Sequence, residues 1–117
     1  MPHRDWKFRI QDILDAISAI QNYTQGIEFK SFTEDRRTVD AVVRNLIIIG
    51  EAAVHIPEDI CLEYPNVPWY DMRGMRNIVV HEYFQADDAI IWDTIHVDLP
   101  TLPDLLIKVL EDSPDYQ

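Results

Sequence analysis

The residues best suited to catalysis lie together in one segment of the chain, Arg73-Gly-Met-Arg-Asn-Ile-Val-Val-His-Glu-Tyr83. A guanidinium binds phosphate through a planar fork of N–H donors. An imidazole can accept and release a proton near neutral pH. Arg76 and His81, five residues apart, therefore provide a minimal set of groups for cleaving a phosphodiester without a metal ion.

Helical spacing sorts the polar side chains of this segment onto neighbouring lines, because each residue of an α-helix turns by about 100°. Arg76 and Tyr83 share one line, Asn77 and His81 share the next, and Arg73 lies between them. Local unwinding near His81 would bring the imidazole closer to Arg76. One copy of the chain supplies one histidine here, whereas RNA cleavage by 2′-hydroxyl attack uses both a base and an acid. A symmetric homodimer joined through this face would supply two.

The composition is that of a folded chain, since 47% of its 117 residues are hydrophobic. We expect a single domain over residues 1–117, with a frayed tail at 113–117. The chain contains no apolar run of the roughly 18 residues that a membrane span needs. A single cysteine, Cys61, cannot form an intrachain disulfide, so we expect a reduced, cytoplasmic setting. We expect Cys61 itself to lie in the core. We expect no metal and no cofactor, because neither a metal-ligand cluster nor a glycine-rich phosphate loop is present.

The net charge of −11 disfavours general binding to nucleic acid. The acids are concentrated toward the end of the chain. Residues 82–117 contain nine acids and one base, whereas residues 1–81 contain twelve acids and nine bases. A local basic cleft around the arginines is therefore compatible with the composition. Alternatively, the acidic surface binds a basic partner protein or keeps the chain in solution.

Apolar residues recur at spacings of three and four along most of the chain, which is typical of helices that bury one face. Glycine is scarce and strand-like alternation is weak. The pattern predicts an all-α antiparallel bundle of about five helices. The first predicted helix covers residues 5–24. The second is long, and its apolar stripe runs over residues 39–54. The other three cover residues 58–64, 69–83 and 88–110.

Particular residues mark the expected ends of these helices. Asp5 could cap the first helix and Gly26 could end it. The sequence Ser31-Phe-Thr-Glu34 resembles a capping box before the second long helix. Asp87 or Asp88 could cap the last helix, in which Pro100 and Pro103 should cause a break or a kink.

The segment Arg76-Asn77-(three residues)-His81-Glu82-Tyr83 resembles the motif of the HepT toxin family, within the HEPN superfamily of small all-α proteins. Upstream, Arg44-Asn-Leu-Ile-Ile-Ile-Gly50-Glu51-Ala-Ala is similar to the second-helix pattern of that family. Trp92-Asp-Thr-Ile fits its last helix. The resemblance covers most of the chain and implies a HEPN-like bundle.

The resemblance implies a metal-independent endoribonuclease toxin that acts as a homodimer. Arg76 and His81 would be catalytic, and Asn77 would orient the phosphate or the histidine. It also implies a cognate antitoxin, a minimal nucleotidyltransferase of the MntA type, which silences the toxin by transferring AMP from ATP to Tyr83. AMP would add bulk and negative charge beside the phosphate site and so repel RNA.

Two further residues are expected to support the site. Glu51 follows Gly50 in an apolar helix, where a carboxylate is costly unless it is paired. It could hold an arginine of the site or lie exposed at the helix edge. Arg73 could contribute to the site, and either arginine could instead form an ordinary surface ion pair with Asp71, Glu82 or Glu51. Gly50 is expected to allow close packing of two helices.

Two other classes of function fit the same residues. In the first, the chain is a non-enzymatic accessory or substrate-binding subunit of a nucleotidyltransferase, and Arg76 and His81 hold a nucleotide phosphate. In the second, the chain is a structural bundle that oligomerises through its acidic last third. Three aromatic residues flank the motif, namely Trp69, Tyr70 and Phe84. They could stack on RNA bases. The ordinary role of such residues is packing in the core or at an interface.

Overall fold

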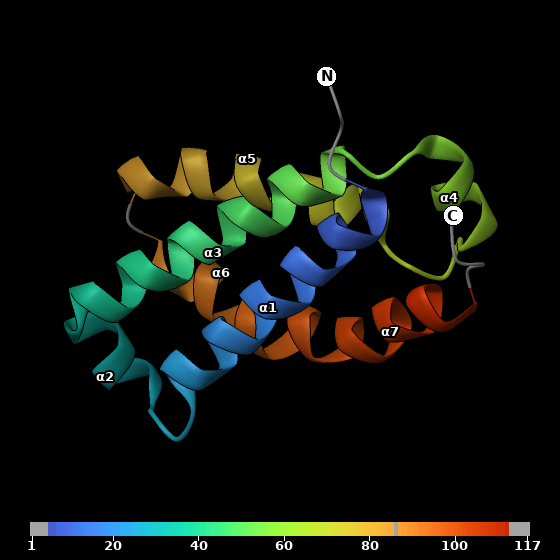
Figure 1. Ribbon diagram of the computed structural model, residues 1–117. Coiled ribbons are helices and arrows are strands. Elements are labelled where there is room, and N and C mark those ends of the chain that lie inside the picture. Colours follow the sequence, from blue (N-terminus) through green and yellow to red (C-terminus); the bar gives the residue numbers. More distant parts are fainter. Residues whose placement is uncertain (1–4, 86, 113–117) are drawn as a thin grey trace.

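The computed structural model describes residues 5–85 and 87–112, except for the side chains of 78–85. The predicted tail at 113–117 lies outside these residues. The chain folds into helices packed side by side, which confirms the predicted all-α class (Figure 1). The helices are α1 (Trp6–Thr24), α2 (Phe29–Glu34), α3 (Arg36–Val54), α4 (Glu58–Glu63), α5 (Trp69–Gln85), α6 (Asp88–Asp93) and α7 (Leu102–Asp112), with a π-helical turn (Thr94–Asp98) and a 3-10 turn (Leu99–Thr101) between α6 and α7.

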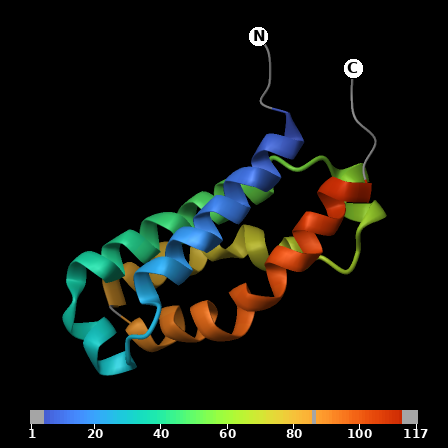
Figure 2. The same ribbon diagram turned by 60° about the horizontal axis from the view of Figure 1, so that its bottom comes forward.

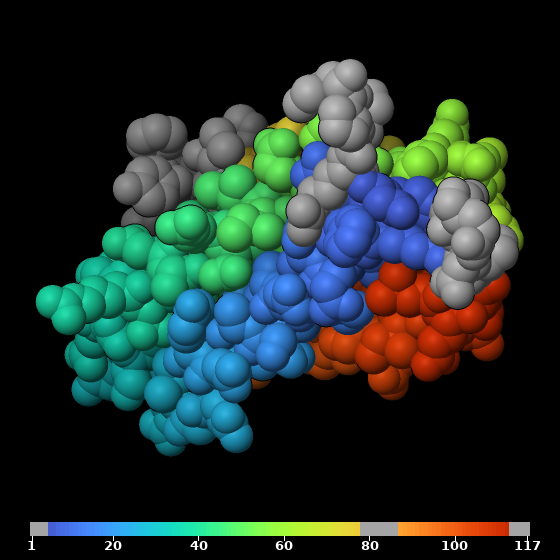
Figure 3. All heavy atoms as spheres, in the orientation of Figure 1, coloured from blue at the N-terminus to red at the C-terminus, as the bar shows by residue number. Residues whose placement is uncertain are grey.

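Helix α3 is the centre of the bundle, because it packs against α1 on one side and α5 on the other. Helix α7 packs along α1, and Figure 3 shows α1 in the middle of one face, between α3 and α7. The core is built from the apolar stripes of these helices, and its fully buried members include Ile10, Ile13, Ile17, Val42, Leu46, Ile49, Leu102 and Leu106. Among the described residues, none of the helices has the length and apolarity that crossing a membrane would require.

The ends of the first helix agree with the sequence. The Asp5 carboxylate accepts a hydrogen bond from the Lys7 N–H at 3.0 Å and caps α1. Gly26 follows the helix with a φ of 75°, in the left-handed region that glycine adopts without strain.

The predicted capping box at residues 31–34 is wrong, because these residues belong to α2 itself. Helix α3 begins instead after Asp35, whose carboxylate accepts hydrogen bonds from the Thr38 N–H at 3.2 Å and the Thr38 hydroxyl at 2.7 Å. These bonds from Thr38 lower the pKa of Asp35. The extra helical turn of α2 places Phe32 in the core, where it is fully buried. Burial of this ring therefore decides between two competing caps.

The last part of the bundle stays helical through both prolines, as Figure 2 shows for the bent path that runs from α6 to α7. A proline donates no backbone hydrogen bond and crowds the carbonyl four residues earlier. The Leu99 carbonyl, which would face Pro103 in a regular helix, accepts from the Leu102 N–H instead. The Leu99 N–H itself donates to Thr94 O, five residues back. The expected break is thus a pair of irregular turns rather than an interruption.

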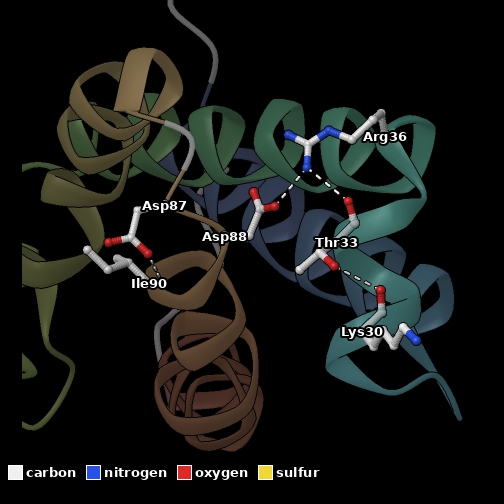
Figure 4. A network of polar contacts seen from close by, with 6 residues as sticks. All are labelled: Lys30, Thr33, Arg36, Asp87, Asp88 and Ile90. Carbon is white, nitrogen blue, oxygen red and sulfur yellow. Dashed lines mark hydrogen bonds and ion pairs between the residues drawn. The ribbon is translucent and has the colours of Figure 1, made fainter.

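A polar contact fixes the start of α6 against the start of α3. Figure 4 shows the Arg36 guanidinium between the Asp88 carboxylate and the Thr33 carbonyl, at 2.7 Å and 3.2 Å from Nη1. The Asp88 side chain is only 13% exposed. Asp87 caps α6 by accepting from the Ile90 N–H at 3.3 Å, as one of the two predicted alternatives. Helix α5 carries the motif from Arg76 to Tyr83, and α6 begins soon after it ends. The Arg36–Asp88 contact therefore anchors the chain that follows α5.

Replacing Arg36 with alanine should lower the free energy of unfolding by about 1–2 kcal/mol, because it leaves a mostly buried carboxylate without its cation. Urea denaturation followed by circular dichroism measures this loss. Arg37→Ala is the matched control, since Arg37 is an exposed neighbour on the same helix. Equal midpoints for the two variants would show that the contact with Asp88 adds no stability.

Candidate active site

The position of Arg76 is set by a close approach of α5 to α3. A Cβ atom on Gly50 would lie 2.8 Å from both the Cβ and the backbone nitrogen of Arg76. No larger residue fits there unless the helices move apart. The predicted role of Gly50 in close helix packing is therefore confirmed, and the contact falls at the arginine of the motif.

Arg76 forms an ion pair with the residue that follows this glycine. Its Nη1 donates to Glu51 Oε1 at 2.8 Å. The Arg76 and Glu51 side chains are 37% and 51% exposed. The sequence left two alternatives for Glu51, pairing with an arginine of the site or exposure at the helix edge. The structure shows both, because Glu51 pairs with Arg76 and is exposed. An exposed pair of this kind contributes little to stability, but it holds the guanidinium in one orientation while leaving it accessible to an anion.

Among the described side chains, Arg73 contacts a thiol rather than one of the acids suggested by the sequence, and the Glu82 side chain lies outside the described residues. The Arg73 Nη2 lies 3.8 Å from the Cys61 sulfur in α4. Cys61 is buried, which confirms its predicted core position. Burial raises the pKa of the Cys61 thiol, and the Arg73 guanidinium offsets part of that rise. The thiol is therefore protonated at neutral pH and is a poor nucleophile.

Alkylation by iodoacetamide should be much slower for Cys61 in the folded protein than in the urea-unfolded chain. The folded thiol keeps its proton to a higher pH than the ordinary value of 9.0, so its reactivity should rise only in alkaline buffer. The free energy of unfolding should also fall as the pH rises above 9.0. In that range the unfolded chain loses the thiol proton while the folded chain still keeps it, which favours the unfolded state. Mass spectrometry over a pH series measures the alkylation rate, and Arg73→Ala should slow it further. Equal rates for the folded and unfolded chains would contradict the protected position.

A cleft of about 580 Å³ lies beside the motif helix, within the size range of ligand sites. It brings together three of the predicted site residues, Arg73, Arg76 and Asn77. We refer to it as the α5 cleft, and its other lining residues are Val54, Tyr70, Asp71, Gly74, Met75, Thr94 and Asp98. Thr94 and Asp98 were not predicted from the sequence, because their position depends on the π-helical turn.

The two remaining motif residues lie on the same helix, and their side chains are outside the described residues. The backbone of α5 continues to Gln85, through His81 and Tyr83. The helix predicted over 69–83 is therefore confirmed, and its backbone does not unwind near His81. Helical spacing still places His81 on the face of Asn77, one turn further along. The roles of Arg76, Asn77, His81 and Tyr83 remain predictions.

The described side chains contain no group of three His, Cys, Asp or Glu residues that could hold a metal ion. The described lining of the α5 cleft offers two guanidiniums, an amide, a phenol, an aliphatic hydroxyl and two carboxylates. The guanidinium and amide N–H groups are donors that can bind and orient an anionic group and stabilise charge that develops on it.

Comparison with known proteins agrees with this chemistry. A protein of Thermococcus cleftensis named "Probable ribonuclease HepT" is 40% identical over 100 residues, which cover 86% of this chain and 88% of the relative. Two proteins of Methanocaldococcus jannaschii, each named "Putative RNase", are 37% and 35% identical over 112 residues. These matches cover 96% of this chain and 93% and 97% of the relatives. No solved structure matches the chain.

The sequence model of the family described as "Ribonuclease HepT-like" matches residues 13–109. This range contains α3, α5 and every described residue that lines the α5 cleft. The family and its ribonuclease class, both predicted from the sequence, are confirmed. The chain belongs to the HepT-like ribonuclease family.

Proposed function

We propose that this protein is a metal-independent endoribonuclease toxin in which Arg76 binds the scissile phosphate and His81 transfers protons. The observation that carries the proposal is the Arg76–Glu51 pair, which presents an oriented, accessible guanidinium at the α5 cleft. Asn77 lines the same cleft, and His81 follows it by one helical turn on the same face. The membership of a ribonuclease family supports RNA as the substrate.

The proposed reaction begins when a base removes the proton of the ribose 2′-hydroxyl. The 2′-oxygen then forms a bond to phosphorus while the bond from phosphorus to the 5′-oxygen breaks. The leaving 5′-oxygen receives a proton from an acid, and the products are a 2′,3′-cyclic phosphate and a 5′-hydroxyl. Arg76 stabilises the extra charge on the phosphate oxygens, and Asn77 orients the phosphate or the histidine.

The need for a base and an acid supports a homodimer as the active species. Each copy carries one histidine in its motif, so two copies would place two His81 imidazoles at one cleft. One would act as the base and the other as the acid. Light scattering at several concentrations measures the oligomeric state in solution.

We further propose that a cognate minimal nucleotidyltransferase silences the toxin by transferring AMP to Tyr83. The transfer would join the tyrosine oxygen to the α-phosphorus of ATP and release pyrophosphate. The added phosphate would lie near Arg76 and compete with RNA for it. Intact mass after co-expression with the cognate nucleotidyltransferase should rise in steps of one AMP, and Tyr83→Phe should abolish the rise.

The experiment that tests the enzyme is cleavage of mixed-sequence RNA by the purified protein in the presence of EDTA. Wild type should cleave and leave cyclic phosphate ends, while His81→Ala should be inactive although folded. Circular dichroism confirms the folding of the variant. Loss of cleavage in EDTA would contradict metal independence. A wild type without cleavage that binds a nucleotidyltransferase and its nucleotide would instead support the accessory-subunit function.

A further inference from the structure

The aromatic residues at the start of α5 have different environments. Trp69 is buried, and its Nε1 donates to the Tyr64 carbonyl at 3.0 Å. Tyr70, the next residue, is 83% exposed and lines the α5 cleft. Of the aromatic residues that the sequence placed near the motif, the structure therefore leaves Tyr70 accessible to a ligand. The side chain of Phe84 lies outside the described residues.

Among the described residues, no contact requires a glycine at position 74. Gly74 lies in the middle of α5, where glycine is less favourable than alanine, and its φ is not in the left-handed region. A Cβ atom at this position would meet no described atom within 4 Å, unlike the Cβ of Gly50. Gly74 lines the α5 cleft one helical turn after Tyr70, on the same face. The missing side chain therefore leaves open space on the cleft wall beside the exposed ring.

The charge of the molecule limits how RNA can be held in this cleft. Proteins that bind RNA through phosphates use many cationic residues. Here the chain carries −11 overall, and the cationic residues among the described lining are Arg73 and Arg76, with Asp71 and Asp98 in the same cleft. Phosphate contacts alone would give weak binding. Stacking of a base on an aromatic ring does not depend on net charge and is tolerant of sequence.

We propose that Tyr70 and Gly74 form a nucleobase-binding subsite, in which an RNA base stacks on the Tyr70 ring and its sugar lies over Gly74. The proposal rests on the proposed ribonuclease function and adds a second point of contact to it. Tyr70 lies six residues before Arg76, which is about 9 Å along the helix axis. The stacked base therefore belongs to a nucleotide neighbouring the phosphate held by Arg76.

The test measures binding of a fluorescent single-stranded 2′-O-methyl RNA by anisotropy, because this RNA lacks the attacking hydroxyl. Tyr70→Ala should weaken binding by about 5- to 100-fold, whereas Tyr70→Phe, which keeps the ring, should bind like wild type. On cleavable RNA, Tyr70→Ala should raise KM with little change in kcat, because stacking binds substrate and transition state alike. Tyr23→Ala is the matched control, since Tyr23 is also exposed but lies on α1 and does not line the α5 cleft.

Gly74→Ala gives a second and independent test. It should raise the Tm by about 2–6 °C, because alanine favours the helix, and it should weaken RNA binding, because the new methyl group occupies the sugar position. A variant that is more stable and binds RNA less well is not expected from a purely structural glycine. Unchanged binding in Gly74→Ala and Tyr70→Ala would overturn the subsite.

The outcomes separate this subsite from the proposed function. A wild type that binds the RNA through Tyr70 but cleaves nothing would refute the ribonuclease proposal and leave the subsite standing. A wild type that cleaves RNA with a KM independent of Tyr70 would refute the subsite alone. Dissociation of a dimer in Tyr70→Ala or Gly74→Ala, detected by light scattering, would assign this surface to a second copy of the chain and overturn the subsite as well.

Discussion

Replacement of Arg76 by alanine should reduce RNA cleavage by at least about 100-fold, because it removes the donor fork that stabilises charge on the phosphate. The fold should survive, since the ion pair with Glu51 is exposed at both side chains and such pairs contribute about 1 kcal/mol or less. Initial rates on a single RNA substrate measure the loss, and circular dichroism measures the fold.

Two further variants show which property of Arg76 matters. Arg76→Lys keeps the charge but not the planar fork, so most of the activity should still be lost. Glu51→Gln keeps Arg76 and removes the negative charge of its partner, which weakens the 2.8 Å contact that orients the guanidinium. We expect a smaller loss of cleavage for Glu51→Gln than for Arg76→Ala. Full activity in Arg76→Ala would refute the assignment of the phosphate-binding residue.

Replacement of Gly50 by valine should lower the free energy of unfolding by about 2–3 kcal/mol and also reduce cleavage. The first new carbon atom would lie 2.8 Å from the backbone nitrogen of Arg76, and backbone cannot move aside as a flexible side chain does. Helix α5 must then shift away from α3 and carry the motif with it. Thermal unfolding and the cleavage assay measure the two effects on the same sample.

Gly74→Ala is the control for the stability part of this prediction, because it also replaces a glycine inside a helix but its new methyl group meets no described atom. The two glycines should therefore respond with opposite signs in stability. Gly50→Val with a wild-type Tm would mean that α3 and α5 can separate at no cost. In that case the close approach could not be what positions Arg76.

Much of the fold was predictable because its long helices bury regular apolar stripes. The stripe of α1 contains Ile10, Ile13 and Ile17, all of which are buried, and the ends of α1 carry their own signals at Asp5 and Gly26. The proximity of Arg73, Arg76 and Asn77 was equally predictable, since all three lie on one helix. The contact between Arg76 and Glu51 was foreseen only as an alternative, because spacing within one helix says little about its neighbours.

The sequence was not sufficient where two local signals competed for one helix start, or where contacts between helices determined the position of a residue. Ser31 and Asp35 are both good capping residues, and the choice between them depends on Phe32, whose burial requires the turn of α2. The cleft residues Thr94 and Asp98 depend on how the backbone accommodates Pro100 and Pro103. No local pattern gives that solution, because each proline alone suggests only a break.

The irregular turns between α6 and α7 also bear on which mutations this segment can accept. A π-helical turn holds more residues than an α-helical turn, and a 3-10 turn holds fewer, so the underwinding of residues 94–98 is offset by the overwinding of residues 99–101. The buried positions Ile91, Ile95, Leu99, Leu102, Leu106 and Val109 accordingly keep spacings of three and four throughout. Exchanging a proline for another residue leaves that phase unchanged, whereas deleting one residue would rotate α7 by about 100° and turn its apolar face away from α1. Homologous proteins should therefore vary in the composition of this segment but not in its length.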